Sequence, residues 1–294
     1  MTNHLTYLYL LTPLHTGGSS SEGNTMGIAR EVHTEFPYLP ASSLRGKIRS
    51  QLEDKHPEEA KIFFGHKIEN GQQPTEGEIW FADATLLFFP IASLSHHLVW
   101  ITCPLWLERW NRWLPKSPLQ PIIKQSRQIL SKQESEQKSA VVSFNTEKLY
   151  LQTALLNKSD IQKIDVKVLS DMILPITSAG GIVSQLTEKL VILTDEDCIA
   201  LVETGLQREV RVALEEKSKT VKGGSFRSEE AIPPETLLFF PWGIKAGKET
   251  SKTANIRTST SQILNDKLQF GGLEGLGRGW ADLKTIVLKK EDTP

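Results

Sequence analysis

Cysteine is nearly absent from this chain of 294 residues, which contains only Cys103 and Cys198. Their spacing fits neither a disulfide framework nor the paired ligands of a zinc site, so we expect no metal centre and a reducing compartment. Long apolar runs are missing as well. The run at residues 5–11 is too short for a membrane span, and no basic residue precedes it as in a signal peptide. The sequence therefore predicts a cytoplasmic protein without a membrane partner.

An excess of charge of either sign is also missing. The chain has 34 Lys and Arg against 35 Asp and Glu, a formal net charge of -1. Such a chain has no general basic field, so any binding of nucleic acid needs a local positive surface. Its 39% hydrophobic and 23% charged residues are typical of a globular protein, and its length allows one large domain with insertions or two small domains.

Strand-like and helix-like segments follow one another without regular βαβ spacing. Short apolar runs predict strands at residues 5–11, 79–89 (one strand, or two with a bulge), 99–103, 149–156, 188–193, 236–242 and 283–288. A helix is expected at about 42–53, where Leu44, Ile48 and Leu52 form an apolar stripe, and another at 106–113, where the tryptophans are typical of a core. A further helix is expected after the strand at 188–193, capped by the segment that begins at Thr194. Residues 124–139 are polar and Gln-rich, which predicts a surface helix or a mobile insertion. The pattern favours an α+β fold with a largely antiparallel sheet.

The start of the first predicted helix combines hydroxyl groups with cations. Ser42 and Ser43 would cap the free amides, and Arg45, Lys47 and Arg49 follow within two turns. Free amides and nearby cations form an anion site. By itself, however, the segment fits a capped surface helix with solvated charges even better.

A second basic segment lies at residues 216–227. It carries Lys219, Lys222 and Arg227, one aromatic residue, Phe226, and the pair Gly223 and Gly224, which permits a tight turn. With the alternating residues 208–215 before it, this pattern predicts a β-hairpin arm with a basic tip. Cations can follow a nucleic-acid backbone while an aromatic ring stacks on bases. The competing interpretation is a solvated loop with a run of charge.

Five glycines gather in the ten residues 271–280, around Gly277 and Arg278. Glycine permits positive φ and close approach of main-chain amides to phosphate, and a guanidinium can grip phosphate at two points. No Gly-Lys-Ser/Thr follows, and too little sequence remains for a βαβ unit. A nucleotide-binding enzyme is therefore disfavoured. Near the N-terminus, His15 precedes Gly17, and His15 and His33 could serve as acid and base, although a lone histidine after a strand is more often structural.

The order of these segments is more specific than any one of them. Residues 11–17, 27–31, 39–46 and 271–280 together resemble the RAMP superfamily of CRISPR effector proteins. Within it the chain is most similar to the repeated backbone subunits of type III-B (Cmr) complexes, the fourth Cmr subunit family. Residues 220–237 resemble that family's thumb, and residues 77–84 resemble the strand after its first helix. The resemblance implies one RAMP domain at 1–294, with an RRM- or ferredoxin-like palm, a thumb hairpin at 206–236 and a partly helical insertion at 104–185.

The same resemblance implies function. Such a subunit binds crRNA and complementary target RNA, stacks on copies of itself head to tail as in a filament, and joins other Cmr subunits. One rigid unit repeated along the guide would divide the duplex into segments of about six nucleotides. The RNA-binding residues that the resemblance implies, together with those of the basic arm, are His15, Gly17, Arg30, Ser42, Ser43, Arg45, Lys47, Arg49, Lys219, Lys222, Phe226, Arg227, Gly277 and Arg278.

Cutting of target RNA is a separate question. The family usually has a catalytic Asp in the loop before Arg30, and this chain has Thr25 at that position. A threonine is neither a base at neutral pH nor a good ligand for a hard metal, so we expect weak or absent cleavage. No cofactor should bind tightly, and a divalent metal is expected only if cutting is retained. Two alternatives stay open: an active endoribonuclease that uses Glu22 or a neighbouring acid, and a stand-alone RNA-processing enzyme that uses His15 and His33.

Overall fold

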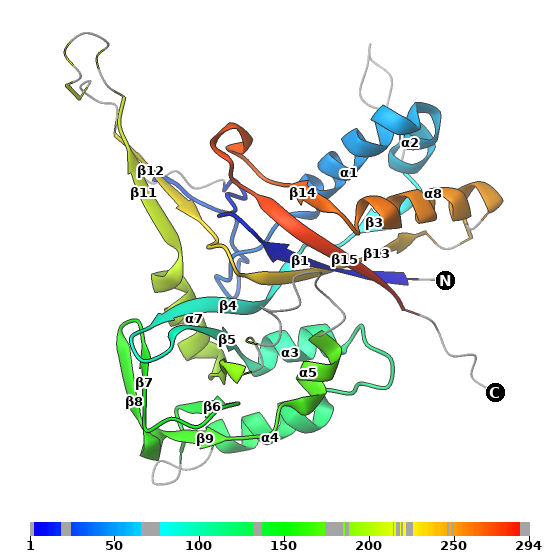
Figure 1. The fold of residues 1–294 in the computed structure, drawn as a ribbon. Coiled ribbons are helices and arrows are strands. Elements are labelled where there is room, and N and C mark those ends of the chain that lie inside the picture. The colour runs from blue at the N-terminus through cyan, green and yellow to red at the C-terminus, as the bar shows by residue number, and fades with distance from the viewer. Residues whose placement is uncertain are drawn as a thin grey trace.

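A large twisted sheet with helices on both faces forms the body of the protein, and an arm that belongs to a second, three-stranded sheet projects from it (Figure 1). The computed structural model describes residues 3–18, 25–65, 77–131, 137–173, 188–213, 226–245 and 250–288, together with 185, 215, 218, 220, 221, 247 and 248. Within these residues no helix is both long enough and apolar enough to cross a membrane.

The main sheet has ten strands in the order β14-β15-β1-β13-β4-β5-β10-β6-β9, and β3 pairs with β13 beside this path. Only the β10–β5 and β6–β9 pairs are parallel. This confirms the predicted α+β fold with a mostly antiparallel sheet. The strands are β1 (Asn3–Leu10), β3 (Ile79–Phe81), β4 (Thr85–Ser93), β5 (His97–Thr102), β6 (Ala140–Val142), β9 (Ile161–Lys163), β10 (Leu190–Ile192), β13 (Leu237–Ile244), β14 (Lys267–Gln269) and β15 (Trp280–Leu288).

Each face of the sheet packs against its own helices, because the central strands are apolar on both sides. Along β1, Leu8 and Leu10 join the core under α1 (Ala41–Lys55), α2 (Pro57–Phe64) and α8 (Ser251–Ile263). Tyr7 and Tyr9 join the opposite core under α3 (Pro104–Asn111), α4 (Gln120–Leu130) and α5 (Lys167–Ile173). Figure 1 shows these two helical layers above and below the sheet.

Most of the predicted elements are present. The apolar stripe Leu44, Ile48 and Leu52 is fully buried on α1, and Trp106 and Trp110 are fully buried in α3, as expected of core residues. The run at 79–89 is two strands, β3 and β4, which are separated at residues 82–84. The run at 149–156 is a hairpin, β7 (Lys148–Leu151) and β8 (Ala154–Asn157), with a turn between the strands.

The interpretation of residues 124–139 as surface is wrong for the helical part. Helix α4 begins earlier, at Gln120, and buries Ile122, Ile123, Ile129 and Leu130 in the core. The segment is rich in Gln, Ser and Lys, so its average composition suggested a surface position. The apolar face of the helix is defined instead by the spacing of its isoleucine and leucine residues. Residues 132–136 lie outside the described residues. Strands β6 and β9, together with β10, extend the main sheet, and the domain limits suggested by the sequence remain predictions.

The arm is a small sheet of its own. Strands β11 (Gln207–Arg211) and β12 (Arg227–Ala231) are antiparallel, and β2 (Thr25–Met26) pairs with β12 in parallel. The arm follows directly after α7 (Asp195–Gly205), whose first turn is capped by the Thr194 hydroxyl, as predicted. Because β2 lies against β12, the chain that precedes Arg30 is tied to the base of the arm.

Candidate nucleic-acid interface

The start of α1 and the glycine-rich loop meet at one edge of the sheet. The Lys47 Nζ of α1 lies 3.4 Å from an Oε of Glu274, in the short helix η2 (Glu274–Leu276) of the loop. Leu39 pairs with Ala84, which fixes the entry to the helix beside the β3–β4 connection. Two segments far apart in the sequence, both predicted to contact RNA, are thus neighbours in the fold.

The predicted serine caps of α1 are wrong. Pro40 occupies the N-cap position, and no side chain of that residue can accept from the helix amides. Asp83 takes this role instead, since its Oδ1 accepts the Ala41 N–H at 2.7 Å. Ser42 is exposed and Ser43 half-buried in the first turn, so their hydroxyls are available to a ligand rather than used as caps.

The two arginines of α1 bind main-chain carbonyls of neighbouring segments. Arg45 donates to the carbonyls of Phe64 (2.6 Å) and Ile79 (3.2 Å), and its guanidinium lies 5.0 Å from the centre of the Phe64 ring. Burial, with a further contribution from Arg49, lowers the pKa of Arg45. Arg49 donates to the Gly65 carbonyl at 3.0 Å and to Glu53 at 2.7 Å. These cations therefore cap the end of α2, and any phosphate contact must share them with that task.

Close packing within the protein requires glycine at two positions of the loop. Gly271 and Gly279 have φ of +80° and +81°. A Cβ on Gly279 would lie 1.8 Å from the Phe270 carbonyl oxygen, and one on Gly271 would lie 2.3 Å from the His15 carbonyl oxygen. Gly277 also has positive φ, +76°, but a Cβ there would meet nothing. The loop is therefore pressed against residues 13–15 at Gly271 and Gly279, whereas open space for a ligand is left around Gly275 and Gly277.

His15 and Gly17 lie beside this loop. The imidazole is 4% exposed, and its Nδ1 donates to the Glu230 carbonyl at 2.8 Å. Gly17 is exposed with φ +68°, a conformation that favours glycine. His33 is exposed in the turn at residues 32–34, and the described residues show no contact between the two rings. The buried position of His15 fits a structural role better than acid–base work.

Arg278 and Arg30 are both bound to carboxylates of the arm. The Arg278 side chain is 6% exposed, and its Nη2 lies 2.7 Å from an Oε of Glu209 and 3.8 Å from Glu229. Arg211 contacts the same two carboxylates, at 3.2 Å and 3.0 Å. Sequence reasoning missed these partners. We expected Arg278 to bind phosphate. To do so, its side chain would have to break its ion pairs with Glu209 and Glu229.

Arg30 belongs to a second cluster at the base of the arm. Its guanidinium lies 2.7 Å from Glu203 of α7 and 3.2 Å from Glu230 of β12. Arg208 binds the same two acids, Glu230 at 3.0 Å and also Glu203. The two clusters connect the glycine-rich loop, the segment after β2 and helix α7 to the arm, and so fix the direction in which the arm projects.

The arm carries exposed apolar side chains. Val210 is 69% exposed and Phe226 is 53% exposed, and Val212 is exposed beside them. The β11–β12 register ends at the pair Arg211 and Arg227, and Val212 and Phe226 are the next residues of the chain beyond that pair. Arg227 is exposed opposite Arg211. Lys219, Lys222 and Glu22 lie outside the described residues. Thr25 is described only through its main chain, which pairs with Ser228.

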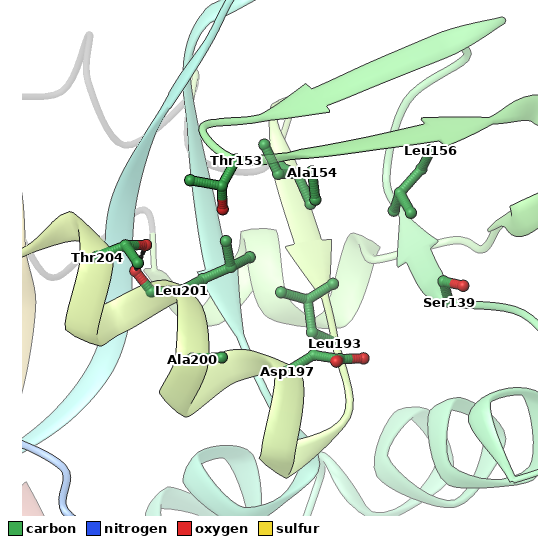
Figure 2. A pocket seen from close by; sticks show the side chains of 10 residues that line it. Ser139, Thr153, Ala154, Leu156, Leu193, Asp197, Ala200, Leu201 and Thr204 are labelled. Atoms are coloured by element: carbon green, nitrogen blue, oxygen red, sulfur yellow. Dashed lines mark hydrogen bonds between the residues drawn. The ribbon is translucent and has the colours of Figure 1, made fainter.

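A cavity of 340 Å³ lies away from this region, between α7 and the β7–β8 hairpin (Figure 2). Figure 2 shows Leu156, Leu193 and Leu201 lining it, with Asp197 next to Leu193. Its lining contains no Lys, Arg or His, which disfavours phosphate. The described part of the chain holds no group of three His, Cys, Asp or Glu residues suited to a metal. Cys103 and Cys198 are both free and buried, and burial raises the pKa of the Cys198 thiol.

Residues 7–282 match the family model of the RAMP superfamily. The chain belongs to the RAMP superfamily. This RAMP protein is 29% identical over 286 residues to the CRISPR system Cmr endoribonuclease Cmr4 of Pyrococcus furiosus, a match that covers 95% of this chain and 94% of that protein. It is 24% identical to the CRISPR system CMR subunit Cmr4 of Saccharolobus solfataricus, over 95% of each chain.

Solved structures agree with this RAMP assignment at the level of the fold. The oligomeric Cmr4 from Pyrococcus furiosus superposes with a TM-score of 0.70 at 24% identity, over 99% of this chain and 100% of that one. A chain of a type III-B Cmr-beta complex bound to cognate target RNA gives a TM-score of 0.74 at 21% identity, over 96% of each chain. The shared architecture is a large, mostly antiparallel sheet with several helices, and the RRM-like description of its palm stays a prediction.

Proposed function

We propose that this protein is a crRNA-binding backbone subunit, repeated head to tail in a type III-B CRISPR ribonucleoprotein. The observation that carries the proposal is the meeting of α1, the glycine-rich loop and the base of the arm at one edge of the sheet. Membership of the RAMP superfamily and the similarity to Cmr4 proteins over 95% of the chain support it. Other Cmr subunits, crRNA and complementary target RNA are the partners, in the cytoplasm.

The local chemistry supports single-stranded RNA as the ligand. The chain as a whole is nearly neutral, but Ser42, Lys47 and the open side of the loop at Gly277 offer hydroxyl, ammonium and main-chain groups to a backbone. The exposed Phe226 and Arg227 of the arm add a ring that can stack on a base and a cation. These groups act together only in the folded chain.

The test is binding of single-stranded RNA by the purified protein at several salt concentrations. The logarithm of the association constant should fall with the logarithm of salt concentration, by about 0.7 for each phosphate contacted. Lys47→Ala and Arg227→Ala should weaken binding and reduce this slope, whereas Arg127→Ala, a surface change on α4, should not. The proposal is refuted if the protein does not bind RNA, or if its affinity for RNA does not depend on salt concentration.

We further propose that cleavage of target RNA by this subunit is weak or absent. Thr25 occupies the position where the family usually has Asp, and a hydroxyl cannot act as a base near neutral pH. The assembled complex should therefore leave target RNA largely intact, and Thr25→Asp should increase cutting in the presence of a divalent metal. Regularly spaced cuts by the unmodified complex that disappear in Glu22→Ala would instead assign the reaction to Glu22.

The stand-alone processing enzyme is the second candidate function, and stoichiometry distinguishes it. A backbone subunit copurifies with RNA in several copies, whereas a processing enzyme is monomeric or dimeric. The burial of His15 and its bond to the Glu230 carbonyl favour the backbone subunit. Mass measurement of the native ribonucleoprotein decides between them.

A further inference from the structure

We propose that a cavity beside the start of α1 binds one unpaired base of the RNA, an inference that rests on the proposed function. The cavity measures 410 Å³ and lies between the end of α3 and the sheet. This size falls in the lower part of the range for small-molecule sites, about 300–1,000 Å³. Arg112, Trp113 and Thr85 line it, together with Asp83 from the β3–β4 connection.

An aromatic ring and an available cation meet in this cavity. Trp113 is half-buried and lies with its ring centre 6.2 Å from that of Trp80. Arg112 is exposed, and within the described ranges no carboxylate pairs with its guanidinium. One turn earlier, Arg109 is bound by both oxygens of Glu31, at 2.7 Å and 2.8 Å. Indole and guanidinium planes are the groups on which nucleobases stack.

Two polar groups complete the lining. Asp83 is held in place because its Oδ1 accepts the Ala41 N–H, and its other oxygen has no donor among the described residues. Thr85 adds a hydroxyl that can donate or accept. A carboxylate oxygen next to a hydroxyl can accept hydrogen bonds from the amino group of adenine, guanine or cytosine. The base class that the cavity favours is therefore one with an exocyclic amino group.

The position of the cavity agrees with the proposed path of the RNA. Asp83 joins the cavity to the first turn of α1, where Ser42 is exposed to a backbone phosphate. Arg109, which also lines the cavity, binds Glu31, the neighbour in sequence of Arg30 at the base of the arm. A strand that follows α1 toward the arm would thus pass the cavity, and one base could turn into it.

The experiment uses the full-length protein and single-stranded RNA in which one base at a time is replaced by an abasic site. Trp113→Ala should weaken RNA binding by about 5- to 150-fold, the range for loss of one stacked base. Trp113→Phe should keep most of the affinity, and Arg112→Ala and Thr85→Val should each lose part of it. Arg127→Ala, the same charge change outside the cavity, should bind as the unmodified protein does.

The abasic scan gives the decisive result. An abasic site at one position should weaken RNA binding by the unmodified protein. The same abasic site should cause no further loss of affinity in Trp113→Ala, because both changes remove the same contact. Independent, additive losses, or no sensitive position, refute the base site while leaving RNA binding intact. Failure of the unmodified protein to bind RNA refutes the proposed function and this site with it. If Arg112→Ala forms smaller assemblies than the unmodified protein in the absence of RNA, the cavity is an interface with a neighbouring copy. This result also refutes the proposal.

Discussion

Removal of Arg278 tests whether its ion pairs stabilise the junction between the glycine-rich loop and the arm. The guanidinium is almost fully buried, 2.7 Å from Glu209 and 3.8 Å from Glu229. Arg278→Ala leaves Glu229, itself 6% exposed, with one cation instead of two. The perturbation therefore acts on a buried carboxylate rather than on a surface pair.

The magnitude follows from this geometry. Loss of one partner from a buried ion pair costs about 3–5 kcal/mol. Arg211 still contacts both acids, and the Glu209 side chain is 38% exposed, so solvent screens part of the loss. We expect Arg278→Ala to lower the free energy of unfolding by about 2 kcal/mol, or on the order of 4 °C in Tm.

The effect should depend on pH with a definite sign. Burial alone would raise the pKa of Glu209, but the hydrogen bond and charge of Arg278 outweigh it, and the net pKa is lowered. A carboxylate with a lowered pKa adds stability above its unfolded pKa, about 4.3, and loses it as the pH falls further. The difference between Arg278→Ala and the unmodified protein should therefore be largest near pH 7 and shrink below about pH 4.

Urea unfolding at a series of pH values measures both quantities. Arg127→Ala is the matched control, because it removes the same side chain from a half-exposed pair with Glu108 at 2.9 Å, and it should cost less than about 0.5 kcal/mol. The reasoning is refuted if Arg278→Ala costs no more than this control. It is also refuted if the deficit at about pH 2 to 3, below the unfolded pKa, is the same as at pH 7.

Three further predictions concern packing and protonation. Gly279→Ala should destabilise the protein by at least about 3 kcal/mol in thermal or chemical unfolding, since its Cβ would overlap the Phe270 carbonyl, whereas Gly275→Ala, with open space around it, should be nearly neutral; equal effects would contradict the close packing of the loop. Burial, with a smaller effect of Arg257, lowers the pKa of His4 to about 4, so stability should fall as the pH drops from about 6.5 toward 4, and His4→Phe should flatten this part of the stability profile. Ile48→Ala should cost about 2–5 kcal/mol, because this side chain is fully buried on the inner face of α1; a cost below about 1 kcal/mol would argue against that packing.

The sequence by itself determined those features that depend on neighbours along the chain. The spacing of Leu44, Ile48 and Leu52 predicted the buried face of α1. Apolar runs predicted the longer strands of the main sheet, but not the three-residue strands β6, β9 and β14. Thr194 marked the start of α7. These signals are local, because helix and strand periods and caps act over a few residues. The order of short motifs also indicated the superfamily that the comparison confirmed.

The partners of the charged residues were decided only by the tertiary structure. Arg278 and Glu209 are far apart in the sequence, as are Arg30 and Glu230, so no local pattern shows that these cations are already paired. The same holds for Asp83, which caps α1 from another segment, and for the carbonyls that hold Arg45. A sequence shows which residues carry charge, but the fold decides which charges meet, because an ion pair depends on distance in space and not along the chain.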